Sequence, residues 1–145
     1  MLKDKVEIAI EAFETGNNCA QSVIKAFAEE LKINETQAMQ MASGFGGGMG
    51  KLQHTCGAVT GAFMVIGLKN SLAIQLHEER SDKTVQMIQE FESRFVGAHE
   101  SSLCKDVIKC DLNTEEGQKY FKEERVGEFI CQNCIFNAIR ILEEV

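Results

Sequence analysis

Apolar side chains recur every three to four positions along most of this chain, which is the spacing that places them on one face of an α-helix. Such stripes occupy residues 6–13, 23–31, 85–95 and 135–142. Alternating patterns bounded by hairpin turns, as strands would show, are missing. The pattern predicts an all-α fold, and 145 residues, 44% of them hydrophobic, suffice for one core. We therefore expect residues 1–145 to form a single-domain bundle of about six to eight short helices with a glycine-rich loop.

Capping residues and glycines divide this pattern into separate helices. Side chains suited to cap a helix N terminus stand at Asn18, Asn34, Thr55, Ser101 or Ser102, and Thr114. The amphipathic helix over residues 85–95 is expected to end at Gly97. Gly127 marks a break before the last helix, which is expected to begin at Phe129 or Ile130.

The segment from Gly44 to Gly50 interrupts the helices most strongly, with five glycines in seven residues. Glycine adopts positive φ angles readily and lets a backbone approach another group closely. Gly57 and Gly61, four apart on one helix face, serve either tight helix packing or the access of a cofactor or partner thiol to Cys56. The candidate cofactor-binding residues are Gly46, Gly47, Gly48, Gly57 and Gly61. A phosphate site is only weakly indicated, because no Lys-Ser/Thr pair follows in P-loop register.

Four of the six cysteines fall in the opening turns of expected helices, namely Cys19, Cys56, Cys104 and Cys131. The helix dipole and the free backbone N–H groups of an opening turn favour a negative sulfur and lower the pKa of a thiol. Cys110 is expected beyond its helix, and Cys134 one turn inside the last one. The pattern indicates thiol or metal chemistry, with a small buried hydrophobe as the alternative for each cysteine.

Cys131 and Cys134 form the one Cys-x-x-Cys pair, in which an outer thiol can be acidified and an inner thiol can resolve a mixed disulfide. The βαβ context of a thioredoxin-like protein is missing, and Ile135 stands where c-type haem attachment requires histidine. Separations of 37, 48 and 27 residues between the four helix-start cysteines do not by themselves establish a metal site. Such a site requires the four to converge in space.

Two histidines lie close to these cysteines along the chain. His54 precedes Cys56 by two residues and His99 precedes Cys104 by five, so each is a candidate base or ligand. For both residues, the alternative is a loop histidine that has no functional role. A nucleophilic hydrolase built on Cys56 and His54 lacks a third orienting group and any sign of an oxyanion hole.

Charge and hydropathy limit the partners and the cellular compartment that we expect for the protein. A net charge of −7 and a pI near 5.0 disfavour a nucleic-acid partner, because no Lys/Arg cluster could neutralise several phosphates. Neither an export signal nor an apolar run long enough to span a bilayer is visible, so no membrane association is expected. We expect a cytoplasmic protein, in whose reducing surroundings cysteines are more often redox-active or metal-binding than cross-linked.

With these motifs in view, the sequence resembles the family of redox-active proteins named for its cysteine pattern, C_GCAxxG_C_C. Five segments carry the resemblance over essentially the whole chain: Gly16-Asn-Asn-Cys-Ala-Gln-Ser-Val23, Ala42-Ser-Gly-Phe-Gly-Gly-Gly-Met-Gly50, Thr55-Cys-Gly-Ala-Val-Thr-Gly-Ala62, the Cys104 segment through Asp111-Leu-Asn-Thr114, and Cys131. The resemblance implies that the family's four defining cysteines are Cys19, Cys56, Cys104 and Cys131. Cys110 and Cys134 are then extras, and Gln132 stands where the family often has proline.

We therefore expect an electron or thiol carrier that serves a redox partner protein or an oxidoreductase. Cys56 and Cys131 are the candidate catalytic thiols, and the candidate metal ligands are Cys19, Cys56, Cys104 and Cys131. An iron–sulfur cluster is slightly favoured over a dithiol relay, because helix N termini around one anionic centre would stabilise its charge. The alternatives are a zinc-binding structural or interaction module without redox activity and a plain bundle with core cysteines. The apolar, glycine-spaced face of the Cys56 helix suggests a homodimer.

Overall fold

The structure is a computed structural model that describes residues 3–145, and within them the chain forms helices and loops with one isolated bridge between Thr55 and Leu103. The elements are α1 (Lys5–Glu14), α2 (Cys19–Ala28), α3 (Glu35–Met41), α4 (Gly57–Ala73), α5 (His77–His99), α6 (Cys104–Ile108), α7 (Glu115–Glu123), the π-helical turn η1 (Gly127–Cys131) and α8 (Gln132–Glu144). The prediction of an all-α domain of six to eight helices with a glycine-rich loop is confirmed.

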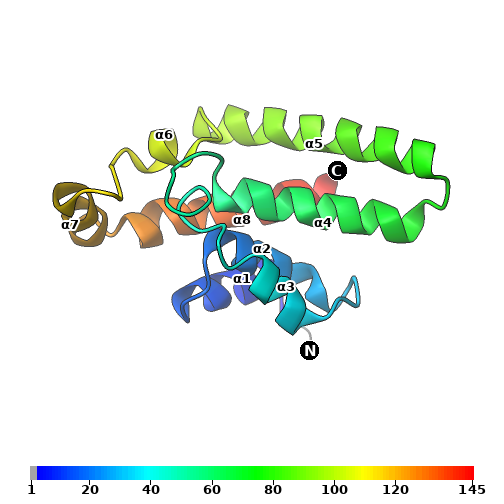
Figure 1. Ribbon diagram of the computed structural model, residues 1–145, viewed down its shortest axis with the longest axis horizontal. Helices are drawn as coiled ribbons and strands as arrows, with labels where there is room; N and C mark the ends of the chain where they lie inside the picture. Colours follow the sequence, from blue (N-terminus) through cyan, green and yellow to red (C-terminus); the bar gives the residue numbers. More distant parts are fainter. Residues whose placement is uncertain (1–2) are drawn as a thin grey trace.

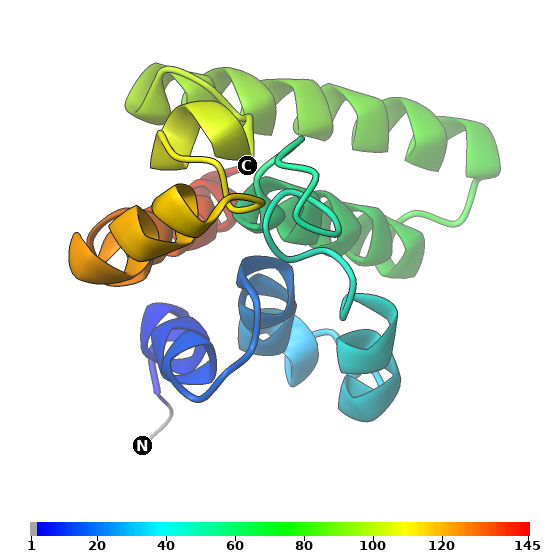
Figure 2. The ribbon, with the colours of Figure 1, turned by 60° about the vertical axis from the view of Figure 1, so that its left-hand side comes forward.

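The helices pack in layers around α4 and α8, which contact each other (Figure 1). The long helix α5 covers one side of both, while α1 and α2 cover the other, and α3 packs on the outside of α2. Figure 2 shows the loop before α4 lying between α2, α4 and the segment that carries α6 and α7. Loop and short helices therefore gather at one end of the bundle, around the N termini of α2 and α4.

A core of aliphatic and aromatic side chains holds these layers together. Phe91 and Phe95 of α5 are fully buried and stacked with ring centroids 6.0 Å apart. They pack with Ile66 of α4 and with Ile135 and Ile139 of α8 in one continuous cluster. Burying such a side chain stabilises the fold by about 1.5–3 kcal/mol. Within residues 3–145 no helix combines the length and the apolar character needed to cross a bilayer.

Local side-chain caps set three of the helix starts as predicted. Asn18, Asn34 and Thr114 each accept a hydrogen bond from the backbone N–H group three residues further on. At Asn18 the cap is reciprocal, because the Gln21 side chain accepts from the Asn18 N–H at 2.9 Å. A cap of this kind contributes about 1 kcal/mol, so these starts are fixed by local sequence.

The helix over residues 85–95 extends further at both ends than the sequence predicted. Helix α5 begins at His77 and passes through Gly97 to His99, where Glu100 closes it with a φ of 69°. A single glycine costs a helix only about 1 kcal/mol relative to alanine, and the packing of α5 against α4 and α8 offsets that cost. The two added residues carry the His99 ring toward α8.

The glycine-rich loop is a left-handed turn. Residues 47–51 all have positive φ angles, between 57° and 70°. The turn is closed by backbone hydrogen bonds such as Gly50 N–H to the Gly44 carbonyl at 2.7 Å and Gln53 N–H to the Gly47 carbonyl at 3.0 Å. Three of the five residues are glycines, which tolerate this conformation without steric strain. The expectation of positive φ angles in this segment is confirmed.

Candidate functional site

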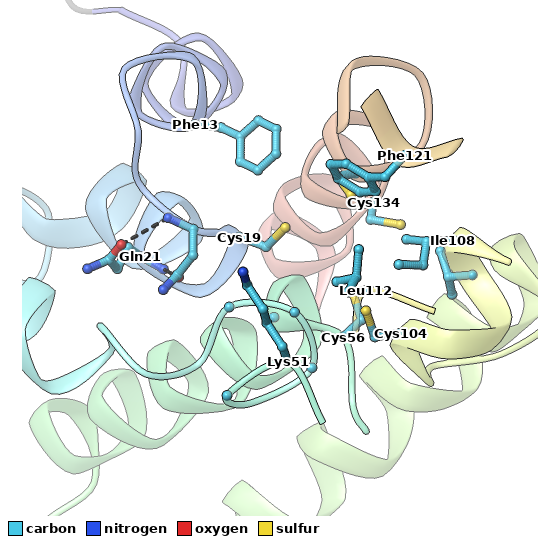
Figure 3. A pocket seen from close by; sticks show the side chains of 18 of the residues that line it. Phe13, Cys19, Gln21, Lys51, Cys56, Cys104, Ile108, Leu112, Phe121 and Cys134 are labelled. Atoms are coloured by element: carbon cyan, nitrogen blue, oxygen red, sulfur yellow. Dashed lines mark hydrogen bonds between the residues drawn. The ribbon is translucent and has the colours of Figure 1, made fainter. Parts of the chain in front are cut away.

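Five of the six cysteines line one cavity of about 820 Å³ at the end of the bundle where the loops gather (Figure 3). They are Cys19, Cys56, Cys104, Cys131 and Cys134. The glycine-rich loop forms one wall, and side chains from α1, α6 and α7 complete the lining. The four cysteines singled out in the sequence therefore converge, and Cys134 joins them. No disulfide is formed among the described residues.

Cys19 is the first residue of α2, as predicted. Its position depends on Asn18, which caps α2 and also holds the loop, because its side-chain amide donates to the Ala42 carbonyl at 3.0 Å and to the Ser43 carbonyl at 3.2 Å. One asparagine thus fixes the start of the helix, the thiol and the first residues of the glycine-rich loop relative to one another.

The prediction that Thr55 caps the helix of Cys56 is wrong. Cys56 is itself the N-cap residue, and α4 begins at Gly57. Thr55 instead forms the bridge with Leu103. Next to that bridge, the Cys56 N–H donates to the Ser102 carbonyl at 2.7 Å. This hydrogen bond between backbone groups holds the helix start in place of a side-chain cap.

Cys104 opens α6, but neither serine caps that helix. Leu103 is the N-cap residue, and the Ser101 hydroxyl accepts from the Leu103 N–H one step earlier. The Cys104 N–H donates to the His54 carbonyl at 2.6 Å. Two backbone hydrogen bonds across the bridge therefore hold the Cys56 and Cys104 segments against each other.

Cys131 does not open a helix, which corrects the prediction. The chain is already helical from Val126, and Cys131 ends the π-helical turn that leads into α8 without a break. Its position lies beyond the first turn, where backbone N–H groups have intrahelical partners. The dipole argument therefore does not apply to Cys131. The sequence suggested a break at Gly127, but the helical conformation continues through this residue.

Glycines allow the backbone to approach the thiols closely. A Cβ atom built on Gly48 would lie 2.7 Å from the Cys104 Cβ, and one built on Gly57 would lie 2.9 Å from the Cys19 Cβ. Both distances are too short for real atoms, so only glycine fits. Gly46 and Gly47 line the same cavity.

Gly61, by contrast, does not line the cavity, and a Cβ atom built on it would lie 2.8 Å from the Ala20 carbonyl oxygen. Its role is helix packing between α4 and α2. The glycine-spaced face that suggested a homodimer is thus covered by α2 of the same chain.

The thiols interact in pairs. Hydrogen bonding with the Cys134 thiol, aided by the nearby N–H groups of Ala58 and Val59, lowers the pKa of Cys56 against the opposing effect of burial. The same contact, together with burial, raises the pKa of Cys134. Cys134 therefore keeps its proton and Cys56 is the site where a thiolate forms most readily.

Cys19 pairs with Cys131 in the same way. Hydrogen bonding with the Cys131 thiol is the largest effect that raises the pKa of Cys19, followed by burial. Burial also raises the pKa of Cys104 to about 12, with further contributions from the thiols around it. The two members of the Cys-x-x-Cys motif thus act most strongly on different thiols, Cys131 on Cys19 and Cys134 on Cys56.

Gln53 links the loop before α4 to the segment after α6, a role that the sequence did not indicate. Its buried side-chain amide donates to the Cys110 carbonyl at 2.7 Å and accepts from the Leu112 N–H at 2.8 Å. It also counteracts the raised pKa of Cys104. Nothing local distinguishes this glutamine, because its partners lie 57 and 59 residues away.

Of the two candidate histidines, only His99 reaches a thiol, and not the one that the sequence suggested. Its Nδ1 lies 3.9 Å from the Cys134 Sγ, and the Asn137 side-chain amide donates to its Nε2 at 2.9 Å. Burial lowers the pKa of His99 and so favours the neutral ring. In that ring, donation from Asn137 to Nε2 assigns the proton to Nδ1, which faces the sulfur. His54 is exposed and does not line the cavity.

Cys110 lies beyond α6, as expected, and outside the cavity lining. It packs with Leu112, Phe121 and Cys131 in a small apolar cluster. Burial raises the pKa of its thiol. Its backbone carbonyl, as the acceptor of the Gln53 amide, contributes more to the site than its sulfur does.

The donor set distinguishes between kinds of metal centre. Within residues 3–145 no three His, Cys, Asp or Glu side chains are grouped to bind a single metal ion. A mononuclear zinc site needs four such donors around one point, so a zinc centre stays a prediction. An iron–sulfur cluster takes its thiolates around a larger body, and a cavity lined by five cysteines has the donor chemistry for it.

Comparison with known proteins gave one match. The sequence model of a family described as "Putative redox-active protein (C_GCAxxG_C_C)" matches residues 17–145. The matched range contains all six cysteines and the whole glycine-rich loop. No curated protein and no solved structure matches the chain.

Proposed function

Because the chain belongs to the C_GCAxxG_C_C family of redox-active proteins, we propose that it is a thiol-based redox carrier in which Cys56 and Cys134 form the working pair. The observation that carries the proposal is that both thiols line one cavity, where they lower the pKa of Cys56 and raise that of Cys134. A nucleophilic thiolate beside a protonated resolving thiol is the arrangement that thiol–disulfide exchange requires.

The exchange proceeds in two steps. The Cys56 thiolate attacks one sulfur of an incoming disulfide, so that a mixed disulfide forms and one thiolate leaves. Cys134 then loses its proton and attacks the Cys56 sulfur, which forms the Cys56–Cys134 disulfide and releases the second thiolate. The Cys134 proton leaves with the products, and two electrons pass from the protein to the incoming disulfide.

His99 assists the second step. Its Nδ1–H faces the Cys134 sulfur, and the hydrogen bond from Asn137 to Nε2 keeps the proton on that side of the ring. A donor at this position stabilises the Cys134 thiolate as it forms. His99 is thus a positioning residue for the resolving thiol.

Cys19 and Cys131 provide a second dithiol in the same cavity. Its higher thiol pKa makes Cys19 a poorer nucleophile than Cys56 at neutral pH. We assign this pair to the storage of a second pair of electrons, which raises the capacity of the carrier from two electrons to four.

An iron–sulfur cluster is the second candidate, favoured by the five cysteines that share one cavity. Cys19, Cys56, Cys104 and Cys131 would hold it, and the bound cluster would supply one-electron transfer. The opposite pKa shifts of Cys56 and Cys134 favour the dithiol mechanism, because they provide a nucleophile and a protonated resolving thiol.

The redox partner of this carrier is a protein or small molecule that bears a disulfide or dithiol. Six free thiols are maintained most readily in a reducing compartment, which suits the cytoplasm.

Anaerobic purification with iron, sulfide and zinc analysis separates the candidates. We expect no stoichiometric metal, and equilibration with dithiol–disulfide redox buffers should form the Cys56–Cys134 disulfide in a two-electron transition. Stoichiometric iron and sulfide would replace the dithiol mechanism by the cluster, whereas zinc without a thiol redox transition would indicate a structural module.

A further inference from the structure

Lys51 is the only charged residue that lines the cavity, in a chain whose net charge is −7. Within residues 3–145 its ammonium group forms neither an ion pair nor a hydrogen bond, although lysines elsewhere on the surface pair with glutamates. Figure 3 shows its side chain extending from the glycine-rich loop into the pocket, on the same side as Cys19. An unpartnered cation thus faces an otherwise uncharged cavity.

The backbone holds Lys51 firmly in this position. Its φ angle is 57°, a left-handed conformation that costs a non-glycine residue roughly 1–2 kcal/mol. Its N–H donates to the Gly46 carbonyl at 3.2 Å, and its carbonyl accepts from the Asn113 side chain at 2.8 Å. These two hydrogen bonds therefore offset the cost of the left-handed Lys51 backbone conformation.

Backbone N–H groups add to the positive character of the same wall. Gly46, Gly47 and Gly48 line the cavity, and their backbone N–H groups donate no hydrogen bond to another of the described residues. Successive backbone N–H groups of this kind favour negatively charged ligands. They stand in the segment that ends at Lys51.

Apolar side chains form much of the remaining lining and limit the size of the ligand. Phe13, Ile108, Leu112 and Phe121 face the same space. A volume of about 820 Å³ lies within the range of small-molecule sites. Cys56 is only 7% exposed and Cys134 only 1%, so a reacting disulfide must enter the cavity to meet them.

We propose that the cavity binds a small organic disulfide that carries a carboxylate, with the carboxylate at Lys51 and the glycine N–H groups and the disulfide at Cys56. This inference rests on the proposed exchange at Cys56 and specifies its substrate class. The step is the one described above: the Cys56 thiolate bonds to one ligand sulfur, the other leaves as a thiolate, and closure of Cys56–Cys134 releases the second ligand thiol. The ligand gains two electrons and the cysteine pair loses two.

The test compares the rate of Cys56 modification by three disulfides: dithiobis(nitrobenzoate), which is anionic, dithiodipyridine, which is neutral, and cystamine, which is cationic. Lys51→Gln removes the charge and leaves a polar side chain one atom shorter, Lys51→Arg keeps the charge, and Lys69→Gln on the exposed side of α4 changes the net charge equally outside the cavity. The rate with the anionic disulfide should fall roughly tenfold in Lys51→Gln alone, the size of one hydrogen bond to a charged group. The neutral disulfide should change by less than about twofold. Equal slowing in Lys51→Gln and Lys69→Gln would overturn the inference, because net charge would then explain it.

A non-reactive probe distinguishes this inference from the proposed function. Nitrobenzoate methyl thioether carries the carboxylate but no disulfide, and its binding is measured by calorimetry. Binding that Lys51→Gln abolishes supports the anionic site even if no disulfide modifies Cys56, a result that would defeat the exchange mechanism alone. Reaction of the neutral disulfide at Cys56 without any binding of the thioether would leave the exchange intact and overturn the anionic site.

Discussion

The Cys134 thiol on α8 and the Cys56 thiol at the N terminus of α4 line the same cavity and shift each other's pKa, although 78 residues separate them in the sequence. The two pKa values shift in opposite directions, down for Cys56 and up for Cys134. This difference makes the two cysteines chemically different from each other. The proposed redox pair follows from that asymmetry.

The first prediction concerns the donor. Cys134→Ala removes the proton donor to Cys56 and should raise the pKa of the Cys56 thiol, because the largest effect that lowers it is lost. Cys134→Ser retains an O–H donor at the same place and should leave that pKa close to its value in the unmodified protein. The ultraviolet absorbance of the thiolate as a function of pH measures both. Identical titrations of the two variants would show that Cys134 does not set the pKa of Cys56.

Stability should fall in alkaline solution. The pKa values of Cys19, Cys104 and Cys134 are raised above the usual 9.0, so the folded chain keeps protons that the unfolded chain releases. Their contribution is complete below pH 9 and is lost as the pH rises toward 12, at about 1.4 kcal/mol per pH unit for each thiol. Cys56 has a lowered pKa and adds no slope above pH 9, since its thiol is ionised in both states.

Denaturant unfolding across this range measures the slope. Cys104→Ala should flatten it relative to the unmodified protein, because one of the thiols with a raised pKa is removed. Parallel pH profiles would contradict the assigned pKa of Cys104.

Two glycines of the left-handed turn offer a matched pair. Gly48→Ala places a Cβ 2.7 Å from the Cys104 Cβ, whereas Gly50→Ala, at a similar positive φ, meets open space. Gly50→Ala should cost roughly 1–2 kcal/mol of unfolding free energy from backbone strain alone. Gly48→Ala should cost about 1–3 kcal/mol more from overpacking. Equal losses would mean that the loop does not press against Cys104.

His99→Phe tests the role of the imidazole. Phenylalanine preserves the contact with Phe95, whose ring lies 4.4 Å from that of His99, but removes the N–H donor. Formation of the mixed disulfide at Cys56 should be unchanged, while its resolution by Cys134 should slow by about tenfold or more. Stopped-flow release of a chromogenic thiol separates the two phases. His54→Phe is the control, since His54 is exposed and outside the cavity, and equal slowing in both variants would remove His99 from the mechanism.

Local chemistry made much of the fold predictable. The caps at Asn18, Asn34 and Thr114 follow from side chains that reach their own helix, and residues 47–51 turn left-handed where glycine is dense. The start at Cys56 was predicted less well, because a tertiary bridge between Thr55 and Leu103 replaces the side-chain cap.

The pairing of the thiols could not be predicted in this way. Sequence spacing places Cys131 next to Cys134, but the packing of α8 against α2 and α4 directs one sulfur to Cys19 and the other to Cys56. His99 was associated with Cys104 for the same reason, since its contact with Cys134 exists only where α5 and α8 pack together. Distances along the chain do not report contacts between helices.

Disulfide mapping tests the central claim most directly. The reduced protein is oxidised with a limiting amount of a small disulfide, free thiols are blocked, and the cross-linked peptides are identified by mass spectrometry. The account predicts that the Cys56–Cys134 disulfide forms first and that Cys19–Cys131 follows. A first disulfide between Cys131 and Cys134, as the Cys-x-x-Cys motif alone would suggest, would contradict it.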